Sequence, residues 1–148
     1  MEDNALEIRL IDEEAFDPIL PLLGLINPYM SREMLLDSLE AMRRQGYRCA
    51  YARYGGQYVG VLGLWIQTKF YVGKHVEYDN FYVKPFYRGR GIGTKMLAFA
   101  ENYAIAQGCV ASELSCDVIE ERSREFWEKQ QFVTVGYRYR KRLGPIPS

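Results

Sequence analysis

The sequence has few of the residues that build metal centres and disulfide frameworks. Its 148 residues include one histidine and three cysteines, and Cys49, Cys109 and Cys116 show no regular spacing. This set fits neither a zinc site nor a disulfide scaffold, so we expect no bound metal. A chain of this length buries about 70% of the surface that its unfolded form exposes, enough for one core. We therefore expect a single domain over residues 1–148, with residues 144–148 as a frayed tail.

Long apolar runs and a secretory signal are also missing. The longest stretch without a charged residue, Tyr54–Thr68, contains four glycines. It is shorter than the roughly 20 residues that a membrane-spanning helix needs. The chain begins Met1-Glu2-Asp3, which is acidic where a secretory signal is basic. With so few cysteines, these features predict a cytoplasmic protein that has no membrane partner.

Charge is balanced over the whole chain but not along it. Residues 1–46 contain four basic and ten acidic residues, whereas residues 47–148 contain fifteen basic and nine acidic residues. This basic excess is too small for nonspecific nucleic-acid binding, so we expect no nucleic-acid partner. The stretch from Lys84 to Lys95 has four basic residues, no acidic residue and several glycines, and it could face an anion.

Hydrophobic periodicity predicts a mixed α/β (α+β) chain. The expected strands cover residues 6–10, 48–53, 57–68, 75–83, 111–116 and 132–140. The expected helices are a short one after Asp12 that Pro18 and Pro21 interrupt, one between Ser31 and Gly46, one from Ile92 to Gly108, and one over residues 120–131. Gly55-Gly56 predicts a tight hairpin turn.

The most informative stretch lies where the strand ending at Val83 leads into a glycine-rich loop and then a helix. The loop reads Arg88-Gly89-Arg90-Gly91-Ile92-Gly93-Thr94. Amides at a helix N-terminus point in one direction and favour an anion, and glycines let a phosphate approach the backbone closely. The arginines add charge-assisted donors. This pattern predicts a phosphate-binding turn.

Three other interpretations of the loop are weaker. A P-loop needs Gly-Lys-Ser/Thr, but the order here is Gly93-Thr94-Lys95. A dinucleotide fingerprint needs a third glycine at Thr94 and sits at the first strand of its fold, whereas several strands precede this loop. A glycine-rich turn without any ligand is the remaining alternative.

The loop resembles the Arg/Gln-x-x-Gly-x-Gly/Ala pyrophosphate loop of the GCN5-related N-acetyltransferases (GNAT). The resemblance is sharp over about residues 75–135, where the order of elements also agrees. It implies the GNAT fold, a mixed, mostly antiparallel twisted sheet of six to seven strands with about four helices. It also implies that the parallel strands at 75–83 and 110–116 splay apart around acetyl-CoA, the expected cosubstrate.

The resemblance implies a set of coenzyme-binding residues. The backbone near Phe81 and Val83 would pair with the pantetheine arm, and the loop would bind the diphosphate. Trp127 stands where the family usually has a tyrosine that protonates the leaving sulfur, and an indole is no practical acid. The implied coenzyme-binding residues are Phe81, Val83, Arg88, Gly89, Arg90, Gly91, Ile92, Gly93, Thr94 and Trp127.

Catalysis would require a group that removes a proton from the acceptor amine. His75, Glu77 and Asp79 alternate onto one face of their predicted strand if no bulge intervenes. By resemblance Glu77 is the first candidate base and Asp79 the second, and the backbone N–H of Val83 is the expected oxyanion donor. The alternative is a set of exposed charges on a solvated strand, and we expect His75 to be a surface residue.

The sequence thus predicts an N-acetyltransferase that moves an acetyl group from acetyl-CoA to a primary amine by direct attack. The alternative is a non-catalytic module that binds and senses acyl-CoA, favoured by Trp127. A third hypothesis is an adaptor for an acidic partner, using the basic stretch from Arg138 to Arg142. The acceptor, a small molecule or a protein amine, is not specified. Homodimers are common in the family, and nothing in the sequence decides the oligomeric state.

Overall fold

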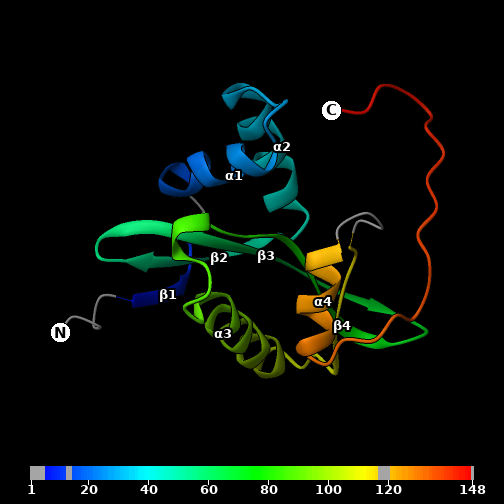
Figure 1. Ribbon diagram of the computed structural model, residues 1–148. Helices are drawn as coiled ribbons and strands as arrows, with labels where there is room; N and C mark the ends of the chain where they lie inside the picture. Colours follow the sequence, from blue (N-terminus) through cyan, green and yellow to red (C-terminus); the bar gives the residue numbers. More distant parts are fainter. Residues whose placement is uncertain (1–5, 13–14, 117–120, 148) are drawn as a thin grey trace.

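The computed structural model describes residues 6–12, 15–116 and 121–147. A twisted five-stranded sheet separates α1 and α2 on one face from α3 on the other (Figure 1). The strands are β1 (Leu6–Leu10), β2 (Arg48–Tyr54), β3 (Gln57–Lys69), β4 (Gly73–Val83) and β5 (Ala111–Leu114). The helices are α1 (Leu20–Ile26), α2 (Arg32–Arg44), α3 (Ile92–Ala106) and α4 (Glu121–Lys129), with short 3-10 turns at Asp17–Ile19 and Pro85–Tyr87.

The sheet is antiparallel except at one edge. Its order is β1-β2-β3-β4-β5, and only β4 and β5 run parallel. The predicted hairpin at Gly55-Gly56 joins β2 to β3, and both glycines have positive φ angles. The predicted N-cap of α2 is also confirmed, because the Ser31 hydroxyl accepts a 3.1 Å hydrogen bond from the Met34 amide.

Two hydrophobic clusters pack on opposite faces of the sheet. Ile19, Leu22 and Leu39 belong to the cluster under α1 and α2. Met96 and Ala100 bring the buried face of α3 onto the other side. These apolar faces account for the helical spacing of the sequence. No helix within the described residues is long and apolar enough to cross a membrane.

A β-bulge in β4 moves the odd-numbered side chains of this strand from one face of the sheet to the other. Gly63 pairs with Asp79 and Val61 pairs with Tyr82, so β4 has one extra residue between these two pairs. Asn80 lies in this bulge with a φ of 52°. Before the bulge the odd-numbered residues face α1 and α2, and after it the odd-numbered Phe81 packs with the α3 cluster.

Gly63 is a glycine because the bulge and a buried tyrosine leave it no room. A Cβ at this position would lie 2.8 Å from the Asp79 carbonyl oxygen and would also collide with the Tyr47 ring. We expect Gly63→Ala to lower the free energy of unfolding by about 1–3 kcal/mol, as overpacking does. Chemical denaturation would measure this change.

Gly24→Ala is the matched control for that variant. Gly24 lies in α1, and outside that helix the nearest described atom to its added Cβ would be Leu35 Cδ1, at 3.8 Å. Alanine there should be neutral or stabilise the helix by up to about 1 kcal/mol. Equal stability of the Gly63→Ala variant and the wild type would contradict the close packing at the bulge.

The mixed fold class is confirmed, but the predicted strand at 132–140 does not form. The described residues make five strands, whereas six to seven were expected. Residues 132–140 have the alternating pattern of a strand, yet they pair with no other strand in the described part of the chain. Alternation marks a segment that can pair, but a strand forms only where a neighbour satisfies its backbone groups.

Candidate active site

The parallel strands β4 and β5 separate at their C-terminal ends. They pair only between His75–Tyr78 and Ala111–Leu114, whereas β4 continues to Val83. In the part of the chain that the structure describes, no strand pairs with the β5-facing edge of β4 beyond Tyr78. This unpaired edge corresponds to the splayed parallel pair that the sequence predicts.

The backbone of Val83 faces the unpaired edge. The Lys84 amide donates a 2.8 Å hydrogen bond to the Val59 carbonyl oxygen on β3. Adjacent residues of a strand direct their backbone groups to opposite edges, so the N–H and C=O of Val83 point toward β5. The Val83 carbonyl oxygen accepts a 2.6 Å bond from Arg88 Nε. The structure thus brings together the predicted oxyanion donor and the first arginine of the loop.

The glycine-rich loop is open to a ligand. Gly89 and Gly91 have φ angles of 77° and 82°, and beyond its chain neighbours a Cβ on either would meet no atom of the described residues within 4 Å. Among the described residues, none of the amides of residues 89–94 donates to a backbone acceptor. These amides precede or open α3, at the positive end of its dipole. The loop therefore has the donors and the open space that a diphosphate requires.

The rest of the loop is held by packing. A Cβ on Gly93 would lie 3.1 Å from Phe81 Cζ, so glycine lets α3 approach β4 closely. The Thr94 hydroxyl accepts a 3.4 Å bond from Gln130 Nε2, just after α4. The guanidinium of Arg90 lies 5.0 Å from the ring centroid of Phe86, which holds this cation beside the loop. Ile92 is buried under the helix start.

Trp127 joins α4 to the splayed strands. Its ring centroid lies 5.4 Å from that of Phe81 and 5.2 Å from that of Phe132. Phe126 also stacks on Phe81, at 5.7 Å. The indole therefore contributes apolar packing beside one of the predicted coenzyme-binding residues.

The predicted acidic residues lie on one face of β4, because the bulge follows them. Asp79 is exposed, and its two oxygens accept hydrogen bonds from Trp65 Nε1 at 3.1 Å and the Asn80 amide at 2.8 Å. Glu77 is half-buried and lies in register with Glu113 of β5. No hydrogen bond or ion pair holds Glu77 within the described residues. Glu77 is thus the less constrained of the two carboxylates.

The prediction that His75 is a surface residue is wrong. Its side chain is 2% exposed, because the Gly73–Val83 strand runs between β3 and β5 at this level. Its Nδ1 lies 3.0 Å from the Gly73 carbonyl oxygen, which can only accept, so Nδ1 carries the proton. Nε2 lies 3.8 Å from Glu113 Oε1, too far for a hydrogen bond, and that oxygen accepts a 3.3 Å bond from the Tyr71 hydroxyl.

Sequence reasoning missed Glu113, Tyr47 and Asn80. Burial, reinforced by Cys49 and Asp79, raises the pKa of Tyr47 well above its ordinary value, so the phenol stays protonated. It donates a 2.8 Å hydrogen bond to Asn80 Oδ1 and fixes the bulge. An asparagine between charged and aromatic strand residues was the one available signal, because asparagine tolerates a positive φ. Burial likewise raises the pKa of Cys49 to about 12, which leaves it an unreactive thiol.

A protein-family model that matches most of the chain identifies its family. Residues 10–132 match the model of the acetyltransferase (GNAT) family, so this chain belongs to the GNAT family. No curated protein matches it. In the described residues no group of three or more His, Cys, Asp or Glu side chains could hold a metal ion.

Solved structures show the same fold. An acetyltransferase of Trypanosoma brucei is 28% identical, with a TM-score of 0.73 over 93% of this chain and 99% of that one. An aminoglycoside N-acetyltransferase, AAC(6')-Iy, in complex with CoA is 17% identical, with a TM-score of 0.82 over 93% of this chain and 95% of that one. A ribosomal-protein-alanine N-acetyltransferase from Brucella melitensis biovar Abortus 2308 is 20% identical, with a TM-score of 0.80 over 95% of this chain and all of that one.

Proposed function

We propose that this GNAT protein transfers an acetyl group from acetyl-CoA to a primary amine by direct attack, without a covalent enzyme intermediate. The observation that carries the proposal is the open loop beside the splayed strands. Within the described residues its amides at 89–94 have no backbone acceptor, and the backbone of Val83 faces the unpaired edge of β4. When bound, acetyl-CoA would supply an activated acyl group as a thioester.

The loop would hold the diphosphate of the coenzyme. The amides that follow Arg88 donate from the positive end of α3, and Gly89 and Gly91 leave room for phosphate oxygens. The charges of Arg88 and Arg90 add to this attraction. On β4, the amide of Val83 is directed to the edge where it could donate to a thioester carbonyl oxygen.

Glu77 is the proposed general base. A primary ammonium has a pKa near 10.4 in water, so an amine acceptor must lose a proton before it can attack at neutral pH. Glu77 has no hydrogen bond in the described residues, whereas both oxygens of Asp79 are occupied. We therefore propose that Glu77 takes the proton, directly or through water, and that Asp79 orients the bulge.

A cationic amine is the proposed class of acceptor. Glu77, Asp79 and Glu113 lie on the face of the sheet that also carries α1 and α2. Three carboxylates on one surface would attract a positively charged substrate. Two of the proteins with similar structures are named as aminoglycoside acetyltransferases, which supports this class for a small-molecule acceptor.

A panel assay tests the proposal. The release of coenzyme A thiol would be followed with an aminoglycoside, a polyamine and a peptide with a free N-terminus, and acetyl-CoA binding would be measured by calorimetry. We expect binding together with turnover of at least one cationic amine. No binding and no turnover would overturn the proposal.

The alternative function is a module that binds acyl-CoA without catalysis. It is favoured by Trp127, which stands where the family usually has a tyrosine that protonates the leaving sulfur. The indole packs among aromatic rings. Tight binding of acetyl-CoA with no transfer to any amine would support this alternative. A thiolate leaves readily without protonation, so we favour the enzyme.

A further inference from the structure

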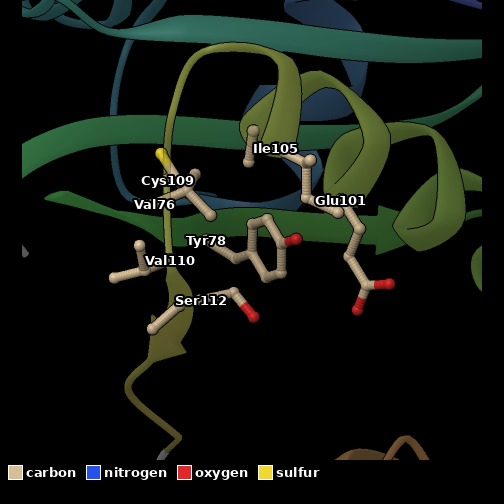
Figure 2. A pocket seen from close by; sticks show the side chains of 9 residues that line it. Val76, Tyr78, Glu101, Ile105, Cys109, Val110 and Ser112 are labelled. Atoms are coloured by element: carbon tan, nitrogen blue, oxygen red, sulfur yellow. The ribbon is translucent and has the colours of Figure 1, made fainter.

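The strands β4 and β5 present different chemistry on their two faces. On the α3 side, Val76 of β4 and Ser112 of β5 line a mostly apolar pocket of about 180 Å³ (Figure 2). Neighbouring residues of a strand alternate between the faces, so His75, Glu77 and Glu113 point to the opposite side. The ionisable side chains of the parallel pair therefore gather on the face that also carries α1 and α2.

Glu77 and Glu113 are neighbours on this face. They lie in register on the two parallel strands, so their Cα atoms are about 5 Å apart. Among the described residues, no lysine or arginine forms an ion pair with either carboxylate. Like charges that lie opposite each other across a sheet destabilise it. The arrangement therefore favours a bound cation.

His75 presents an acceptor to the same place. The side chain is 2% exposed, and its Nδ1 proton is bonded to the Gly73 carbonyl oxygen. A neutral imidazole with a protonated Nδ1 has a lone pair on Nε2. This Nε2 faces Glu113 Oε1 at 3.8 Å and makes no hydrogen bond within the described residues. Two acceptors thus face each other, and a group with several N–H donors can bond to both.

Tyr71 holds Glu113 while leaving a way in from solvent. Its hydroxyl donates a 3.3 Å bond to Glu113 Oε1, and its ring centroid lies 6.5 Å from that of His75. Desolvation, and then the charges of Glu113 and Glu77, raise the pKa of Tyr71, so the phenol remains a donor. The Glu113 side chain is 27% exposed and Tyr71 is 71% exposed. A ligand can therefore reach the two acceptors from the surface.

We propose that His75, Glu113 and Tyr71 form a subsite for the second ammonium group of a diamine acceptor, whose first amino group reacts beside Glu77. This inference rests on the proposed function and narrows its acceptor to amines with two cationic nitrogens. The ammonium would donate to His75 Nε2 and to Glu113, and the Tyr71 ring would lie beside it. His75 and Glu77 are two strand residues apart, roughly 7 Å, which is comparable with the length of a four-carbon diamine.

Kinetics with a matched pair of acceptors test the subsite. Butane-1,4-diamine has an ammonium at each end, and pentylamine has a methyl group in place of one of them. At saturating acetyl-CoA, Glu113→Gln should raise the KM for the diamine by about tenfold or more, because it removes a charged acceptor. The kcat for the diamine and the KM for pentylamine should stay within about twofold of the wild-type values. Tyr71→Phe keeps the ring but loses the bond to Glu113, so it should raise the KM for the diamine by about threefold.

Glu101→Gln is the matched control for charge. Glu101 lines the pocket on the α3 side (Figure 2), so this change removes one carboxylate without touching the subsite. The KM values for both amines should stay within about twofold of the wild-type values. An increase in the diamine KM equal to that of Glu113→Gln would show that net charge attracts the diamine, and would overturn the subsite.

The imidazole gives a readout that does not depend on turnover. Because His75 is the only histidine, its two ring nitrogens can be followed by NMR without ambiguity. Butane-1,4-diamine should shift the Nε2 resonance of the wild type and of Glu101→Gln, and should shift that of Glu113→Gln only at about tenfold higher concentration or more. An Nε2 that carries a proton both before and after the diamine is added would identify His75 as an ion-pair partner of Glu113, and would overturn the subsite.

Failure of the subsite is distinguishable from failure of the proposed function. No binding of acetyl-CoA and no turnover of any amine would overturn both. Turnover of the diamine and pentylamine with equal KM values would overturn the subsite alone, as would a diamine KM that Glu113→Gln leaves unchanged.

Discussion

The variant Glu77→Gln will lower kcat/KM by about 10²–10⁴-fold while leaving the Kd for acetyl-CoA within about twofold of the wild-type value. Glutamine keeps the shape and the half-buried position of the side chain but cannot accept a proton from an ammonium group. The loop that would hold the coenzyme lies beyond the bulge, so its amides are unaffected. Steady-state kinetics with the best amine of the panel, together with calorimetry of acetyl-CoA binding, would measure both quantities.

Asp79→Asn is the matched control for that prediction. Both oxygens of Asp79 already accept hydrogen bonds, from the Trp65 indole and the Asn80 amide. The Asp79→Asn variant should therefore lower kcat/KM by less than about tenfold, mainly through a small shift of the bulge. If Asp79→Asn removed activity and Glu77→Gln did not, the assignment of the base would be reversed.

The variant Gly91→Val will raise the Kd for acetyl-CoA by about 100-fold or more. Gly91 is the N-cap residue of α3 and has a φ of 82°. This left-handed conformation lowers the stability of the fold by about 1–2 kcal/mol when the residue has a side chain. Apart from its chain neighbours, no described atom lies within 4 Å of the position of a Cβ, so the valine methyl groups would extend into the space that we propose for phosphate. Calorimetry would give the Kd, and denaturation would give the change in stability.

Gly56→Val separates the loss of affinity from the loss of stability. Gly56 has a φ of 83°, and its Cβ would likewise meet no described atom within 4 Å beyond its chain neighbours, but it lies in the β2–β3 turn. We expect a comparable loss of stability and an unchanged Kd for acetyl-CoA. Equal affinities in the two variants would show that the loop does not bind the coenzyme.

Local signals in the sequence predicted most of the fold. Ser31 and Gly46 bracket α2, Gly55-Gly56 turns the hairpin, and the spacing of apolar residues after Ile92 gives α3. The open glycine-rich turn at the start of α3 was also predictable, because backbone freedom at glycines and the start of a helix are properties of neighbouring residues.

Features that depend on pairing over long distances were not predictable. The bulge at Asn80 exists because β3 and β4 differ by one residue between Gly63 and Val61, which no local pattern records. The burial of His75 requires a strand on each side of it, and Glu113 meets Glu77 only through the register of two strands that are distant in sequence. The segment after Phe132 has the pattern of a strand, but pairing depends on distant residues, and no described strand pairs with it.

The extra residue at Asn80 would let one strand serve both of the proposed reactants. Glu77 points to the side of α1 and α2, whereas Phe81, four residues later, points to the side of α3. A donor held by the loop and an acceptor held by the carboxylates would thus reach the backbone from opposite sides. Neither would have to depart before the other arrived, and the two could meet without the protein carrying the acyl group itself.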